Sequence, residues 1–160
     1  MFETIITLNQ FLLGYFERLN EDIPDDALTV RPADGNSPLW LLGHLAICGE
    51  FCHQLMGDEL KHPRWVSLFG PGSRGEVSKP ERFSRSEFET AIREGYPSAC
   101  ERLRTLDDGW FEQPHGIDMF RNSTLQTRGD FLGHLLTTHF SFHLAQLSQC
   151  RKAAGHERIV

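Results

Sequence analysis

Residues 127–155 carry apolar side chains at spacings of three and four, which is the repeat of one face of an α-helix. Thr127 is a suitable N-cap for this helix, and Gly155 is a suitable C-terminal stop. The inward face is predicted to comprise Leu132, Leu135, Leu136, His139, Phe142, His143, Gln146, Leu147 and Cys150. A helix this long with one apolar face must bury that face against other elements.

Three further stretches have the same periodicity: residues 2–20, residues 38–56 and residues 84–106. The apolar stripe of the first stretch comprises Ile5, Leu8, Leu12, Tyr15, Phe16 and Leu19. Pro97 lies inside the third stretch, so this helix is expected to be kinked or split in two.

The second helix has the clearest boundaries. Ser37 can cap it, because its hydroxyl can accept a hydrogen bond from a free backbone N–H. Pro38 then occupies the first helical position, where a missing N–H has no cost, and Gly57 is a suitable stop.

Two irregular segments separate the helices. Residues 58–84 are rich in glycine and proline, and their aromatic side chains are expected to fold back over one end of the bundle. In the second segment, residues 117–120 fit either a short strand or a turn. The chain shows neither βαβ alternation nor an internal repeat. It therefore predicts one domain over residues 1–160, an all-α four-helix bundle with a long crossover between its second and third helices.

The net charge of −6 argues against a nucleic-acid partner, which would need a clustered basic face. No segment reaches the ~18 apolar residues of a membrane span. Glu3 stands where a secretory signal would carry positive charge, so a cytoplasmic protein is expected. The cysteines have no CxxC spacing, and buried free thiols are favoured over disulfides. They are Cys48, Cys52, Cys100 and Cys150.

The chain has eight histidines, and three of them are predicted to converge. His139 and His143 are four residues apart, so both project from one face of the fourth helix, with Gln146 beside them. His44 lies on the inward face of the second helix. A single histidine on an apolar face is usually a core residue bonded to a carbonyl or a water. Convergence from two helices instead favours a three-histidine metal site with an open coordination position.

The other histidines are not expected to be ligands. His53 lies about 180° around its helix from His44, and His134 lies about 140° from the direction of His139, by the 100° step per residue of an α-helix. The remaining ones are in loops or at the tail: His62, His115 and His156. Cys48 and Cys52 follow His44 on one side, where packing is favoured over a role as thiolate ligands.

The spacing of His139 and His143 does not indicate a peptidase. That chemistry needs a glutamate directly after the first histidine, and this chain has Phe140 there. Glu50 and Asp130 are predicted to point away from the ligand faces. A metal on three neutral imidazoles would keep its positive charge and could lower the pKa of a bound water or thiol.

The segments "PLWLLGHLA" and "HFSFHLAQL" resemble the second-helix and fourth-helix motifs of the DinB-like superfamily of metal-binding four-helix bundles. The family includes metal-dependent hydrolase-like proteins and transferases that use low-molecular-weight thiols such as bacillithiol or mycothiol. The resemblance implies a divalent ion, commonly zinc or nickel, on His44, His139 and His143, and homodimers are common. Many members have Arg-Gly where this chain has Leu144 and Ala145. This difference weakens any inference of a particular substrate from the family.

Three hypotheses about function follow. The first is a metal-dependent thiol S-transferase or hydrolase that acts on a small-molecule substrate, with Gln146 orienting a ligand or the nucleophile. The second is a non-catalytic bundle that is braced by a metal or that binds a small molecule. The third is a homodimeric interaction module, in which the stripe of the first helix would matter more than the histidines.

Overall fold

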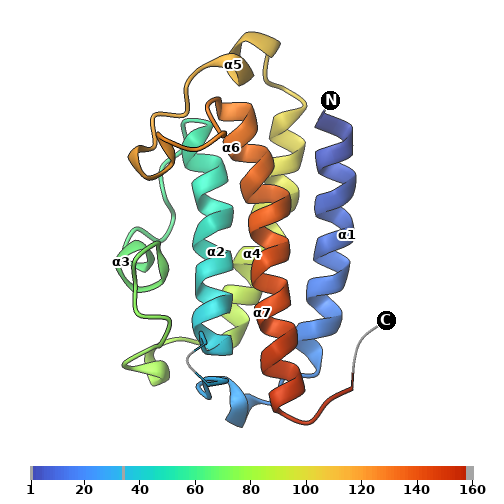
Figure 1. The fold of residues 1–160 in the computed structure, drawn as a ribbon, viewed down its shortest axis with the longest axis vertical. Helices are drawn as coiled ribbons and strands as arrows, with labels where there is room; N and C mark the ends of the chain where they lie inside the picture. Colours follow the sequence, from blue (N-terminus) through green and yellow to red (C-terminus); the bar gives the residue numbers. More distant parts are fainter. Residues whose placement is uncertain (1, 34, 158–160) are drawn as a thin grey trace.

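The computed structural model describes residues 2–33 and 35–157, and its main body is a bundle of long helices (Figure 1). The helices are α1 (Phe2–Glu21), α2 (Pro38–Leu55), α4 (Arg85–Leu103) and a C-terminal rod formed by α6 (Arg128–His134), η4 (Leu135–His139) and α7 (Phe140–Ala153). Apart from an isolated bridge between Pro114 and Thr127, these described residues contain no β-structure. The predicted all-α fold is confirmed.

Short helices occupy the connections. They are η1 (Asp25–Ala27), α3 (Trp65–Phe69), η2 (Pro80–Arg82), α5 (Asp108–Glu112) and η3 (Asp118–Phe120). The segment for which a short strand or a turn was expected is therefore the 3₁₀ turn η3.

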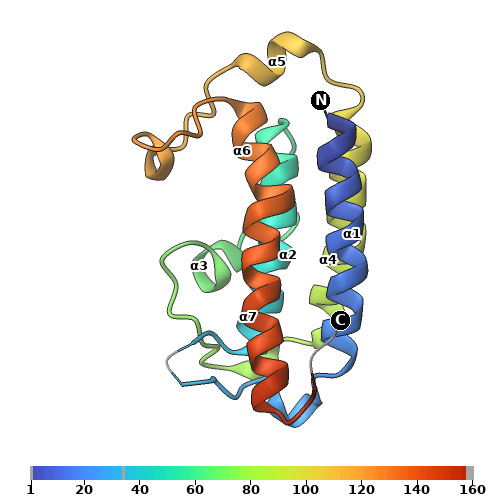
Figure 2. The ribbon, with the colours of Figure 1, turned by 45° about the vertical axis from the view of Figure 1, so that its right-hand side comes forward.

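The long crossover follows from the directions of the helices (Figure 2). α2 and α4 run the same way, so the chain must return along the bundle between them, whereas α1 and the C-terminal rod run the opposite way. On this return path α3 lies against the side of α2. The segment thus covers a side of the bundle near its middle, not one end as expected from sequence (Figure 1). Phe69 is fully buried there.

α2 and α4 pack very closely where two glycines face each other. A Cβ placed on Gly95 would lie 3.8 Å from the Cα of Gly49, and the Tyr96 ring fills the space beside Gly49. The Tyr96 hydroxyl donates a hydrogen bond to the Leu45 carbonyl over 3.1 Å. Of the two expectations for Pro97, a kink or a split, the split does not occur, because Pro97 lies within one continuous α4.

The buried face of α1 differs from the predicted stripe. Phe16 and Leu19 of the predicted stripe are fully buried, but so are Ile6 and Asn9, which it did not include, whereas Leu8 is 48% exposed. The inward direction is thus rotated partway toward Ile6 and Asn9, because α1 packs against both α4 and the C-terminal rod. The rotation brings a polar side chain, that of Asn9, into the core.

The predicted caps of α2 and of the C-terminal rod are present. The Ser37 hydroxyl accepts a hydrogen bond from the Trp40 N–H. Thr127 and Asp130 form a reciprocal capping box, and Gly155 follows the rod with a positive φ of 93°. The rod is interrupted by η4, which is a π-helical turn.

No helix in the described part of the chain is both long enough and apolar enough to cross a membrane.

Candidate metal centre

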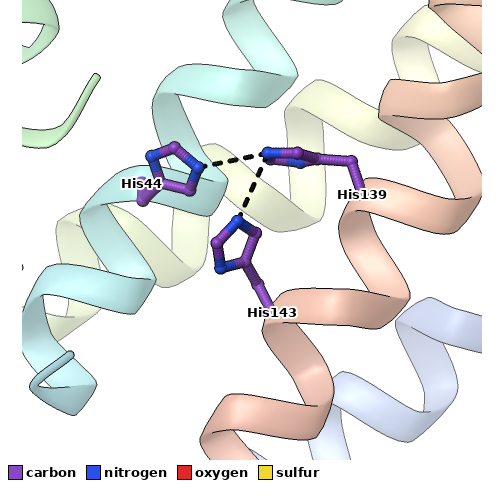
Figure 3. A group of neighbouring side chains, drawn as sticks. All are labelled: His44, His139 and His143. Carbon is purple, nitrogen blue, oxygen red and sulfur yellow. Dashed lines mark hydrogen bonds between the residues drawn. The ribbon is translucent and has the colours of Figure 1, made fainter. Parts of the chain in front are cut away.

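Three histidines, one from α2 and two from the C-terminal rod, meet at one point (Figure 3). His44 comes from α2, His139 is the last residue of η4, and His143 lies one turn later on α7. The Nε2 atom of His139 lies 3.2 Å from Nε2 of His44 and 3.3 Å from Nε2 of His143. The three histidines predicted from sequence are thus brought together.

The spacing of the Nε2 atoms fits a tetrahedral metal ion. Two imidazole ligands at the usual Zn–N distance of about 2.05 Å, separated by a tetrahedral angle, would have nitrogens about 3.3 Å apart. The two distances measured here, 3.2 and 3.3 Å, agree with that value. These residues could therefore hold a metal ion.

The second nitrogens of two rings are held by acceptors. Nδ1 of His44 lies 2.5 Å from the carbonyl oxygen of Phe69, and Nδ1 of His143 lies 3.0 Å from Oε1 of Gln146. A carbonyl oxygen can only accept, so each Nδ1 carries the single N–H of a neutral imidazole. The Nε2 lone pairs of His44 and His143 therefore both point into the cluster.

Without a cation, the ring N–H hydrogens cannot satisfy all the nitrogens that face one another in the cluster. His139 can donate one hydrogen from Nε2 and so satisfies one of the two facing lone pairs, whereas a central cation would satisfy all three nitrogens. Nδ1 of His139 is buried and has no hydrogen-bond partner among the described residues. The donor set, three neutral nitrogens, is one that zinc and other transition metals prefer.

Burial keeps the cluster neutral. Desolvation, followed by the neighbouring histidines, lowers the pKa of His139 to about 2. Desolvation and His44 lower the pKa of His143 to about 4, and desolvation also lowers the pKa of His44. At neutral pH all three rings are thus in the uncharged form, which has one free ring nitrogen to bind a metal.

The cluster lies between α2 and the C-terminal rod, and its three histidines are buried to different degrees. His44 and His143 are 4% and 6% exposed, but His139 is only half-buried. Phe142, predicted to face inward, is 60% exposed and packs its ring against His143. His143, Leu147 and Cys150 are buried as predicted, and the buried face of α7 also includes Phe140, Leu144 and Arg151.

The segment around α3 covers His44. Phe69 supplies the carbonyl, and its ring packs on Gly43, where an added Cβ would lie 2.6 Å from a ring carbon. Trp40 stacks on the His44 ring with centroids 4.7 Å apart, and its Nε1–H donates to Ser73 over 3.0 Å. The sequence predicted that the aromatic residues of this segment cover the bundle, but it indicated neither the contact of the Phe69 carbonyl with His44 nor a role for Trp40.

Gln146 lies behind a ligand. Its Oε1 faces Nδ1 of His143 and also accepts a hydrogen bond from Asn36 over 3.1 Å. It therefore occupies the position of a residue that orients His143, which is one of the two roles considered from sequence. A role in orienting a bound nucleophile would require the opposite side of the ring.

The π-helical turn brings a fourth histidine close. In such a turn residues five apart share a face, and the ring centroids of His134 and His139 lie 5.5 Å apart. The α-helical spacing had placed His134 on another face.

Two carbonyls near the π-helical turn accept side-chain hydrogen bonds. The Leu136 carbonyl accepts one from Asn9 over 2.8 Å, and the Gly133 carbonyl accepts one from Thr137 over 2.6 Å.

The remaining candidates lie away from the cluster or only border it. His53 contacts Gly95 and Ser98 on α4, and the Glu50 carboxylate binds the His62 ring at 2.5 Å. Cys48 Sγ lies 3.7 Å from Nε2 of His44, but burial raises the pKa of this thiol. Within the described residues the group suited to a metal comprises only the three histidines.

The family model of the DinB superfamily matches residues 11–147. The chain belongs to the DinB superfamily. The match includes His44, His139 and His143, so all three converging residues lie in the part of the chain that is shared with this superfamily. No curated protein gives a significant match. Membership in the DinB superfamily and the histidine cluster together fit a metal-binding site.

Proposed function

We propose that this chain is a divalent-metal-dependent enzyme of the thiol S-transferase or hydrolase type, with His44, His139 and His143 as its metal ligands. The observation that carries the proposal is the convergence of three neutral imidazoles, in which Nε2 of His139 lies 3.2 and 3.3 Å from the other two Nε2 atoms. Zinc or nickel is the expected metal, and a low-molecular-weight thiol is the expected co-substrate of a transferase. When bound, the metal would supply the Lewis acidity that lowers the pKa of a coordinated thiol or water.

The residues of the chain itself would hold and shield this centre. Phe69 and Gln146 fix the protons of two imidazoles on Nδ1, which leaves Nε2 free to bind. Trp40 and the segment around α3 exclude water from the His44 side. His139 is half-buried, so a substrate would approach from its side.

The protein donors favour a catalytic over a structural metal. Structural zinc sites usually have four protein ligands, whereas catalytic ones have three and leave a position for water or substrate. The cluster provides three donors within the described residues. The four cysteines are buried and unpaired, in keeping with the reducing cytoplasm in which we place the enzyme.

The proposal is tested by two assays on the metal-loaded protein. Thiol transfer is followed with bacillithiol or mycothiol and the electrophile 1-chloro-2,4-dinitrobenzene, and hydrolysis is followed with 4-nitrophenyl acetate. We expect one of the two reactions to be accelerated by the wild type and not by His139→Ala. A fully metal-loaded protein that accelerates neither reaction would favour the non-catalytic metal-binding bundle.

A further inference from the structure

A second feature of the fold lies further along α2 from the histidine cluster: a cavity of about 480 Å³ between α2, α6 and the loop that carries η3. Its walls are mainly apolar and aromatic, and include Phe51, Leu55, Ile117, Met119 and Phe131. Met119 is 66% exposed at this site, which is unusual for a large apolar side chain. The cavity is of the size that small-molecule sites have in proteins.

The cavity and the histidine cluster share one face of α2. Phe51 and Leu55 follow His44 by seven and eleven residues, so they share its face of α2, about 10 and 16 Å further along the helix. Phe131 precedes His139 on the opposite wall. His134 lies between the two sites, with its ring centroid 5.5 Å from that of His139 and 5.7 Å from that of Phe120.

One positive charge borders this apolar cavity. The Arg128 guanidinium lies over the Trp110 ring, 5.2 Å from its centroid, and lines the cavity. Within residues 2–33 and 35–157 it forms no ion pair with a carboxylate. By contrast, the nearby Arg121 is paired with Asp118 at 2.5 Å. An arginine that is held by an aromatic ring and has no acidic partner is suited to bind the anionic group of a ligand.

We propose that this cavity is the substrate site, and that the substrate is a small carboxylic acid with an aromatic or branched apolar body. The apolar body would lie against Phe51 and Phe131, and the carboxylate would pair with Arg128. The reactive group would then extend past His134 toward His139. The direction of the reactive group rests on the proposed function, whereas binding of the acid does not.

The test compares two probes of the same shape, 2-naphthylacetate and 2-naphthylacetamide, by calorimetric titration of the full-length protein. We expect the acid to bind about tenfold more tightly than the amide, because only the acid can form a charge-assisted pair with the guanidinium. Arg128→Gln should remove this difference. Arg121→Gln is the matched control, and it should leave the affinity for the acid unchanged.

A second variant tests the site without altering the contact between Arg128 and Trp110. Met119→Glu places a negative charge at an exposed position of the cavity wall, so it should weaken binding of the acid and leave binding of the amide unchanged. Equal affinity for acid and amide, absence of binding, or an unchanged preference in Arg128→Gln would overturn the proposal.

Zinc titration of the variants distinguishes a failure of this proposal from a failure of the proposed metal centre. Arg128→Gln should bind zinc as the wild type does, and His139→Ala should keep its preference for the acid. A wild-type protein that does not bind zinc would contradict the metal centre alone. A wild-type protein that binds acid and amide equally would contradict the substrate site alone.

Discussion

Nδ1 of His143 lies 3.0 Å from Oε1 of Gln146, and the same oxygen accepts a hydrogen bond from Asn36. The two contacts hold the Gln146 amide in one orientation. They also fix the proton of His143 on Nδ1 and direct its Nε2 toward His44 and His139. The geometry of the candidate centre therefore depends on a residue that does not itself point into it.

Replacing Gln146 by leucine should weaken zinc binding by about tenfold to a hundredfold, the usual effect of removing a hydrogen-bond partner of a metal ligand. Competition titration with a chromophoric chelator measures this affinity. Gln149→Leu, at an exposed position of the same helix, is the control and should bind zinc normally. Equal affinities in the two variants would mean that Gln146 does not support the ligand.

Asn9→Ala should destabilise the protein by about 1–3 kcal/mol, because it leaves the buried Leu136 carbonyl without its side-chain donor. Since Leu136 belongs to the turn that carries His139, zinc affinity should fall as well. Urea unfolding and zinc titration measure the two effects. Gln10→Ala, at an exposed position, should change neither. A destabilised Asn9→Ala that binds zinc normally would show that the π-helical turn does not depend on this contact.

Gly43→Ala should destabilise the protein by about 1–3 kcal/mol through overpacking, because the new methyl group would lie 2.6 Å from the Phe69 ring. Displacement of Phe69 would also remove the acceptor of His44. Gly14→Ala on α1 is the control, since its Cβ meets no atom within 4 Å, and it should stabilise the helix by up to about 1 kcal/mol. The free energy of unfolding measures both. A Gly43→Ala protein as stable as the wild type would contradict close packing of the α3 segment.

The metal-free protein should lose stability as the pH falls below about 6.5, the ordinary pKa of histidine. In the folded state the pKa of His139 is lowered to about 2 and that of His143 to about 4. Between these values and 6.5 the unfolded chain binds more protons than the folded one, so the free energy of unfolding falls with pH. The loss is about 1.4 kcal/mol per pH unit for each histidine.

Urea unfolding at pH 7, 6 and 5 in the presence of a chelator measures this slope. The comparison with His139→Phe isolates one histidine, because the carboxylates contribute equally to both proteins. The variant should have a slope smaller by about 1.4 kcal/mol per pH unit. Parallel pH profiles would contradict a buried, neutral His139.

The features that local sequence determines were predicted well. The caps at Ser37 and Thr127 depend on side chains next to the helix ends, and the structure has both. The convergence of His44 with His139 and His143 followed from helical spacing and an inward face. The membership in the DinB superfamily that the two helix motifs suggested is confirmed over residues 11–147.

Other features that depend on tertiary contacts were not predicted. The π-helical turn adds a residue to one turn of the rod, and the apolar periodicity does not reveal it, so His134 was assigned to the wrong face. The carbonyl of Phe69 reaches His44 from 25 residues away in the chain, through a loop whose path no local pattern determines. Leu8 and Phe142 are exposed because each lies at the edge of a face whose direction is set by neighbouring helices.

The most direct test of the central claim is the metal content of the protein purified from a metal-replete host, together with X-ray absorption at the edge of the bound metal. We predict one divalent ion per chain, bound by three imidazole nitrogens and at least one ligand that the protein does not supply. His139→Ala should lose the ion and Gln149→Leu should keep it. A wild-type protein that contains no metal, or an ion enclosed by four protein ligands, would contradict the account.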